Sequence, residues 1–312
     1  MFRMPYWRNF PVWLQLVLFA FMIFTFFYFG DSICLYILPK ATGYTIKEIL
    51  TINEASPSSL VRAALIMQGI LHICIFLLPS LLFGYMTTPR PAIYLGLRKP
   101  GKPVQWVLVL LITLGAIPVL MGLEGLFEGM HLGKWADDAQ KAIEKMEKPF
   151  FNFTSFGDFI KVFAILALLP AIGEELFFRG ILMRFMKKRS RNMIYPIILS
   201  GLLFAIAHFT VYGFIPIFMA GILLGTIYYL TGSIWCSMLF HLLNNGLQLI
   251  IVYMAHDNVT IRAFMESNHL PFYIPVTGAI VFVISFYLLW KNKTPLPPQW
   301  ASDYTELSKK EL

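Results

Sequence analysis

Two adjacent carboxylates and an arginine interrupt an apolar stretch of this 312-residue chain, in the segment AIGEELFFRG at residues 171–180. Charged groups inside an apolar span are costly, and those that occur usually face a cavity and work there. On a helix, Glu175 and Arg179 share a face, so an ion pair between them would partly offset the burial of both charges. Glu174 lies about 100° further round the helix axis and is free to face another group. Both carboxylates are therefore candidate functional residues.

Three more polar side chains stand inside later apolar segments. His208 ends the run FAIAH, while His241 and Asn245 are four residues apart and share a helix face. Taken singly, each residue is typical of a hydrogen bond between membrane helices. Taken together, two carboxylates, two imidazoles and an amide contain the parts of a hydrolytic site. A carboxylate can take a proton from water, and imidazole or amide N–H groups can hold the oxyanion that develops on an attacked carbonyl.

Composition identifies the environment in which these groups work. Hydrophobic residues make up 58% of the chain and charged residues only 13%, which indicates an all-α, polytopic membrane protein. The 25 basic residues outnumber the 17 acidic ones, a balance that would suggest nucleic-acid binding in a soluble protein. Here the basic residues cluster between apolar segments, as in cytoplasmic loops. The expected partners are the lipid bilayer and a peptide or protein substrate, not nucleic acid, and the sequence leaves the oligomeric state open.

Three cysteines, Cys34, Cys74 and Cys236, lie far apart and form no C-x-x-C pair. This spacing argues against a disulfide framework and against a thiolate metal site. We predict that they are small apolar filler.

Apolar runs long enough to cross a bilayer, at about 20 residues per crossing, predict a bundle of about eight transmembrane helices. The predicted spans are 12–30, 60–86, 104–122, 159 to the paired glutamates, 193–211, 214–230, 234–254 and 272–290. Basic residues precede the first span, fill the loops at 90–102 and 184–191, and follow the last span, which places both termini in the cytoplasm. We divide the chain into an N-terminal three-span region with an interfacial helix (1–158), a catalytic core (159–254), and a last span with a cytoplasmic tail (255–312).

The longest polar stretch, 123–158, contains an amphipathic pattern. Apolar residues recur there near a 3.6-residue period, which predicts a helix with one apolar face. They are Trp135, Ala139, Ala142, Ile143, Met146 and Phe150. Such a helix could lie in the membrane interface or pack on the rim of the bundle, and the pattern does not separate the two arrangements.

The polar motifs together resemble those of one family of intramembrane proteases, which includes the type II CAAX prenyl proteases and the bacteriocin-processing and Abi-type proteins of bacteria. The family motifs E-E-x-x-x-R, F-x-x-x-H and H-x-x-x-N occur here in the same order. They are Glu174 and Glu175 with Arg179, Phe204 with His208, and His241 with Asn245. The resemblance covers roughly residues 159–253.

This resemblance implies an endopeptidase in which Glu174 activates a water molecule while His208 and Asn245 stabilise the oxyanion. It implies that Glu175, Arg179 and His241 position these groups, and that the site opens toward the cytoplasm. The substrate would be a membrane-associated or leader-bearing peptide or protein, of the CAAX or the bacteriocin type. The enzyme would lie in the cell membrane, as a multi-pass protein of a bacterial inner membrane.

Zinc is a second possibility for the same residues. Glu174, His208 and His241 could supply the three protein ligands of a catalytic zinc ion. The sequence H-E-x-x-H is absent, however, and the resemblance favours a metal-independent glutamate mechanism. No cofactor is therefore expected.

Two other classes of protein remain open on the residues alone. A proton- or ion-coupled transporter would also bury Glu and His side chains at the bilayer midplane. The chain lacks two matching interrupted helices, although Gly221, Gly225 and Gly232 keep this class open. A non-catalytic membrane scaffold derived from a protease is the other alternative.

Two histidines raise separate questions. His72, in the second predicted span, has no titratable neighbour at helical spacing and is predicted to be a structural histidine. His208 should lie about 22 Å along a helix that begins near Met193, whereas His241 should lie only about 10 Å along one that begins near Ile234. The two rings can meet only if the helices tilt strongly or the fifth helix begins outside the membrane.

Overall fold

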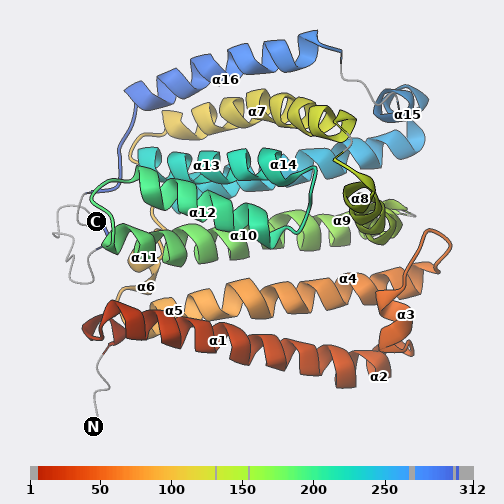
Figure 1. Cartoon of the computed structure of the whole chain (residues 1–312), viewed down its shortest axis with the longest axis horizontal. Coiled ribbons are helices and arrows are strands. Elements are labelled where there is room, and N and C mark those ends of the chain that lie inside the picture. Colours follow the sequence, from red (N-terminus) through yellow and green to blue (C-terminus); the bar gives the residue numbers. More distant parts are fainter. Residues whose placement is uncertain (1–5, 131, 154, 267–270, 298–299, 302–312) are drawn as a thin grey trace.

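The computed structural model describes residues 6–130, 132–153, 155–266, 271–297 and 300–301. Within this part of the chain every regular element is helical. Long helices run back and forth between the two ends of the bundle (Figure 1). This arrangement confirms the prediction of an all-α, polytopic helical bundle, and the three cysteines are buried and free as predicted.

The first half of the chain supplies the helices at the lower side of Figure 1, together with α7 near the upper side and α8 at the right. Its elements are η1 (Trp7–Asn9), α1 (Val12–Ser32), η2 (Ile33–Ile37), α2 (Leu38–Thr42), α3 (Ile46–Leu50), α4 (Ser58–His72), η3 (Ile73–Leu77), α5 (Leu78–Thr87), α6 (Pro91–Tyr94), α7 (Val104–Gly129), α8 (Lys134–Glu147) and η4 (Lys148–Phe151).

The second half holds the predicted catalytic core. Its elements are α9 (Phe156–Phe163), η5 (Ala164–Leu168), α10 (Leu169–Glu175), η6 (Leu176–Leu182), α11 (Met183–Lys188), α12 (Ile194–Ala207), α13 (Phe214–Thr231), α14 (Ile234–Asp257), α15 (Val259–Glu266) and α16 (Tyr273–Lys291). Segments α9 to α11 form one continuous helix that contains both glutamates.

Among the described residues, seven helical segments are long and apolar enough to cross a membrane, so the chain is a multi-pass membrane protein. They cover residues 12–42, 58–87, 104–129, 156–188, 214–231, 234–257 and 273–291. The remaining predicted span, 193–211, forms α12, which has only 14 residues. At 1.5 Å per residue α12 is about 21 Å long, less than the hydrocarbon core of about 30 Å. The helix ends at Ala207, because Phe209 has a positive φ of 52° that a right-handed helix cannot contain.

In the part of the chain that the structure describes, four stretches of π-helix interrupt the long helices. Three of them end two residues before a proline: η2 before Pro39, η3 before Pro79 and η5 before Pro170. Proline lacks a backbone N–H and its ring clashes with the carbonyl four residues earlier, so a wider helical turn relieves the contact. The fourth stretch, η6, contains no proline and begins directly after Glu175. Insertions of this kind are frequent at functional sites.

The predicted basic loops lie at one end of the bundle. Figure 1 shows the start of α1, the connection from α5 to α7 and the connection from α11 to α12 on the same side, which we call the basic end. The α7–α9 connection lies at the opposite, far end. Both groups of loops are therefore where the predicted alternation of spans requires them.

Arg184 differs from its predicted place in a solvated basic loop. The side chain is buried, with the residue only 4% exposed. Its guanidinium lies over the rings of Tyr94 and Trp300, at 4.2 and 4.7 Å. It also donates to the backbone carbonyls of these two residues, at 2.7 and 2.5 Å. The charge is thus satisfied inside the protein.

Arg184 holds the segment that follows α16 against the basic end. The N–H groups of Thr294 and Leu296 donate to the carbonyls of Leu230 and Tyr229, at 2.7 and 3.0 Å. This C-terminal strap, residues 294–297 and 300–301, thereby lies against the turn between α13 and α14. Residues 302–312 of the predicted cytoplasmic tail lie outside the described residues.

Helix α8 confirms the predicted amphipathic helix. Its apolar residues Trp135 and Met146 are 65% and 55% exposed, whereas Asp137 and Glu144 are half-buried. Ile143, from the same predicted face, is half-buried, and Phe150, which lies in η4, is buried. The predicted apolar face is therefore turned partly outward and partly onto the bundle. The Tyr212 hydroxyl donates to Asp137 at 2.5 Å, which ties α8 to the α12–α13 loop and raises the pKa of Tyr212.

Candidate active site

Glu175 is fully buried and bonded from three directions. Its Oε1 atom accepts from Arg179 at 2.7 Å, which confirms the ion pair that the four-residue spacing predicts. The same oxygen lies 3.1 Å from Nδ1 of His241. Oε2 accepts from the Ser237 hydroxyl at 2.5 Å. Both oxygens therefore have protein partners, as a buried charge requires.

Arg179 is equally enclosed. Its second terminal nitrogen donates to the carbonyl of Gly221 at 3.0 Å, and its guanidinium lies 4.6 Å from the ring of Phe204. The carbonyl is within reach because α12 and α13 pack closely: a Cβ on Gly221 would lie 2.8 Å from the Cα of Gly201. Arg179 thus links η6 to α12 and α13.

Glu174 has a different environment from its neighbour. It is 8% exposed, and its Oε2 atom is buried without a hydrogen-bond partner. Its nearest polar groups are two imidazoles, with His72 Nδ1 3.8 Å from Oε1 and His241 Nε2 3.9 Å from Oε2. Both separations exceed a direct hydrogen bond. Of the two glutamates, Glu174 is therefore the one whose oxygen can still accept a hydrogen bond from a water molecule or a substrate.

The partners of His241 indicate its tautomer. A carboxylate only accepts hydrogen bonds, so the Nδ1 atom beside Glu175 carries a proton. In the neutral ring Nε2 is then an acceptor, and it faces Glu174. A water molecule between Glu174 and His241 would find an acceptor on each side.

His208 and Asn245 lie one turn beyond this cluster. The Phe204 ring is 5.6 Å from the His241 ring, so these two residues share a level. Helices α12 and α14 run in the same direction in Figure 1, so His208 and Asn245, each four residues further on, both lie nearer the far end. The His208 ring folds back onto Phe204 at 4.6 Å and its Nδ1 lies 2.8 Å from the Phe204 carbonyl.

These positions explain how His208 and His241 can lie at different depths along their helices. His241 meets Phe204 rather than His208, and His208 is exposed at the end of the short helix α12. Asn245 is half-buried, and its amide oxygen accepts from Asn244 at 3.2 Å. The structure therefore brings four predicted residues into direct contact or close approach, and sets His208 and Asn245 beside them.

Two residues of the cluster were not recognised in the sequence. Ser237 bonds Glu175, and its signal was the four-residue spacing from Ser237 to His241 to Asn245 along α14. His72 was predicted to be structural because no titratable residue lies near it along its own helix. The structure places it against Glu174 of another helix, a contact that no spacing within α4 could reveal.

The sequence leaves zinc open as an alternative, with Glu174, His208 and His241 as its ligands. In the part of the chain that the structure describes, no group of three or more His, Cys, Asp or Glu side chains is arranged to hold a metal ion. No step below therefore passes through a metal.

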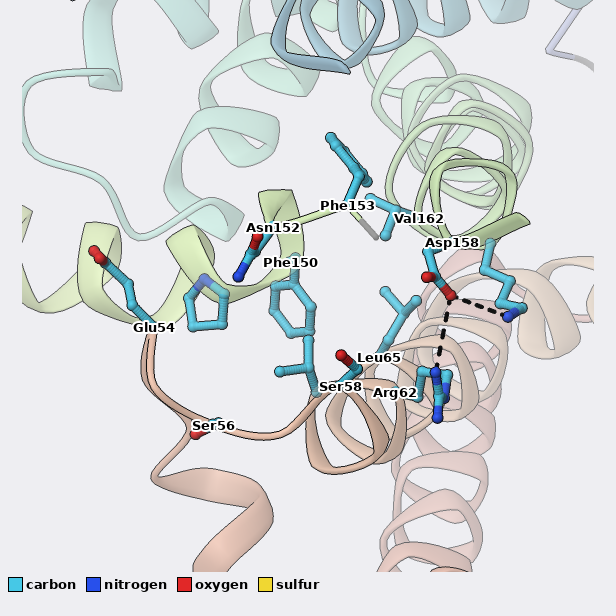
Figure 2. Close-up of a pocket in the computed structure, with 13 residues that line it drawn as sticks. Glu54, Ser56, Ser58, Arg62, Leu65, Phe150, Asn152, Phe153, Asp158 and Val162 are labelled. Atoms are coloured by element: carbon cyan, nitrogen blue, oxygen red, sulfur yellow. Dashed lines mark hydrogen bonds and ion pairs between the residues drawn. The ribbon is translucent and has the colours of Figure 1, made fainter. Parts of the chain in front are cut away.

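A separate pocket opens at the far end, between α4, η4 and α9 (Figure 2). Phe150 and Leu65 form part of its apolar wall. Asp158 stands at its rim between Arg62, at 4.0 Å, and Lys161, at 3.2 Å. The pocket shares no residue with the carboxylate cluster and is not part of it.

Comparison with known sequences agrees with the geometry. Residues 156–247 match the family described as type II CAAX prenyl endopeptidase Rce1-like. The matched segment contains every residue of the cluster except His72. No curated protein and no solved structure matches the chain. At the level of the family, the match supports an intramembrane endopeptidase of the CAAX type. Over residues 156–247 the chain is therefore similar to the Rce1-like family of type II CAAX prenyl endopeptidases.

Proposed function

We propose that the protein hydrolyses a peptide bond of a membrane-associated peptide or protein, with Glu174 as the general base. One observation carries this proposal: of two adjacent buried carboxylates, Glu175 is bonded on both oxygens, whereas Glu174 lies between two imidazoles and its Oε2 atom has no hydrogen-bond partner. A buried acceptor without a partner is unfavourable in hydrocarbon, so a water molecule or a substrate is expected there.

The reaction begins with water held by Glu174 and by Nε2 of His241. Glu174 takes a proton from this water as its oxygen bonds to the scissile carbonyl carbon. Asn245 is an expected N–H donor to the oxyanion. His208, on the same level of a parallel helix, becomes the second donor when its ring proton lies on Nε2 and not on the Nδ1 that faces the Phe204 carbonyl. Glu174 then passes the proton to the amide nitrogen, the C–N bond breaks, and a carboxylic acid and an amine leave.

Glu175 and its partners Arg179, Ser237 and His241 form the frame of this site: they hold the reacting groups in position and do not themselves react. The ion pair with Arg179 and the bond from Ser237 fix Glu175, which in turn fixes the ring orientation of His241. The Arg179 guanidinium lies over the ring of Phe204. Because Phe204 is one helical turn before His208, Arg179 positions the helix of the general base relative to the helix of this oxyanion donor. A mechanism without a metal needs only these groups.

The substrate is expected to reach the site from the membrane. Glu174 lies about 20 Å along the helix from Lys188 at the basic end, which corresponds to the interior of the bilayer. Substrates of the CAAX type or of the bacteriocin type fit this position, because both are peptides carried at the membrane. We assign the basic end and both termini to the cytoplasm of a bacterial cell, on the excess of Lys and Arg in its loops.

Proteoliposomes containing the purified protein test this proposal. The probe is a farnesylated peptide that ends in a C-a-a-X sequence, with the unprenylated peptide in parallel. Digestion is carried out in water labelled with oxygen-18. Mass spectrometry should then show one cleaved peptide bond and one labelled oxygen in the new carboxylate. Failure to cleave either peptide, or cleavage by Glu174→Gln at the wild-type rate, would contradict the proposal.

A further inference from the structure

We propose that His72 of α4 is a positioning residue for Glu174. Its Nδ1–H group orients the Oε1 atom of Glu174, after a small side-chain adjustment or through a bridging water, so that Oε2 is turned toward His241 and the reacting water. This inference rests on the proposed function and adds a residue that lies outside the motifs and outside the matched segment.

The two imidazoles approach different oxygens of one carboxylate. His72 Nδ1 is 3.8 Å from Oε1, and His241 Nε2 is 3.9 Å from Oε2. In the described part of the chain, no other side chain approaches Glu174 as a hydrogen-bond or ion-pair partner. A small side-chain adjustment or a bridging water closes either distance. With Oε1 held by His72, the carboxylate cannot rotate away from His241.

The packing of α4 against α10 fixes the His72 ring. A Cβ on Gly173, the residue before Glu174, would lie only 3.0 Å from His72 Nε2, so glycine is what allows this approach. Phe76 covers the ring from its own helix, with ring centroids 4.8 Å apart. The imidazole is thus enclosed by α10 and by Phe76, and Nδ1 is the nitrogen that faces the carboxylate.

The surroundings of the ring also select its tautomer. Nε2 is buried and has no hydrogen-bond partner. A proton on Nε2 would be a donor without an acceptor, whereas a proton on Nδ1 faces the Glu174 carboxylate. We therefore assign the Nδ1–H tautomer to His72, which is the less common form of a histidine in water.

A purely structural histidine gives a different expectation. A histidine that only bonds two membrane helices together would matter for stability and not for turnover. His72 instead offers its nitrogen to the carboxylate that has no other direct partner. Its removal should therefore lower kcat and leave KM and folding nearly unchanged.

Three substitutions separate these expectations. An Asn amide can place its nitrogen near the position of Nδ1, whereas a Gln amide places it near Nε2. His72→Asn should keep most of kcat, while His72→Gln and His72→Leu should lose about 10- to 100-fold, the loss typical when the partner that orients an active group is removed. Gln68→Leu is the matched control, since Gln68 is half-buried one turn earlier on α4. Its kcat should not change.

Cleavage of the farnesylated peptide in proteoliposomes and the melting temperature are measured on the same preparations. Wild-type kcat in His72→Leu, beside an inactive Glu174→Gln, would overturn the inference and leave the proposed function standing. Equal losses in His72→Asn and His72→Leu would also overturn it.

A second measurement decides the inference if the wild-type protein cleaves nothing. Protein labelled with (15)N-histidine should show His72 as the neutral Nδ1–H tautomer by NMR, and its signals should change in Glu174→Leu. An Nε2–H tautomer in the wild-type protein would refute the assignment, whatever the substrate is.

Discussion

Substitution of Arg179 by alanine should destabilise the protein severely, because it leaves Glu175 as a buried charge without its counter-ion. Glu175 and Arg179 are both 0% exposed and their closest atoms are 2.7 Å apart. Removal of one partner of a buried pair typically costs about 3–5 kcal/mol. The Gly221 carbonyl also loses its donor, although the bonds from Ser237 and His241 to Glu175 remain. We therefore expect a loss of about 3–5 kcal/mol, from a total stability of about 5–15 kcal/mol.

The double variant Glu175→Gln with Arg179→Met isolates the effect of the charge. Both side chains keep much of their length, and neither is charged, so the double variant should be more stable than Arg179→Ala by at least about 2 kcal/mol. Glu174→Gln is the matched control. It changes the adjacent carboxylate, which makes no direct hydrogen bond, and should shift stability by less than about 1 kcal/mol.

Unfolding in mixed detergent micelles, followed by tryptophan fluorescence, measures these differences. The reasoning fails if Arg179→Ala is as stable as the wild-type protein. It fails equally if the double variant loses as much free energy of unfolding as Glu175→Gln and Arg179→Met lose together when each is made alone. The two charges would then not depend on each other.

Three further predictions concern the frame of the site and the ends of the bundle. Arg184→Ala should lower the melting temperature while Lys187→Ala does not, because only Arg184 is buried against Tyr94 and Trp300 and holds the C-terminal strap; equal melting temperatures would contradict its role. Ser237→Ala should reduce the free energy of unfolding by about 1–3 kcal/mol, since Glu175 Oε2 loses its donor, and an unchanged value in the same micelle assay would refute this. Reporter fusions at Lys99 and Lys188 should report the cytoplasm and one at Lys141 the outside; a cytoplasmic signal at Lys141 would reverse the orientation.

Contacts within one helix could be predicted from the sequence, because helical periodicity fixes which residues share a face. The pair of Glu175 with Arg179 is the clearest example, and the amphipathic face of α8 is another. The class of fold followed from the apolar runs in the same way. All of these depend only on spacing along the chain.

Contacts between helices could not be predicted in this way. The approach of His72 to Glu174 depends on the packing of α4 against α10 at Gly173, and Arg184 is buried only because the C-terminal strap returns to the basic end. The shortness of α12 depends on the backbone of Phe209, a residue with no turn signal of its own. These features are tertiary, and one sequence carries no direct record of them.

The central claim is that Glu174 is the base and Glu175 belongs to the frame, and Glu174→Gln tests it most directly. This substitution keeps the shape of the side chain and removes its ability to accept a proton. Cleavage of the farnesylated peptide should fall by about 10²- to 10⁴-fold, the loss typical of removing a general base, while the free energy of unfolding stays near that of the wild-type protein. Cleavage by Glu174→Gln at the wild-type rate would contradict the claim. Wild-type cleavage that a chelator abolishes and zinc restores would contradict it too, and would make Glu174 a metal ligand instead.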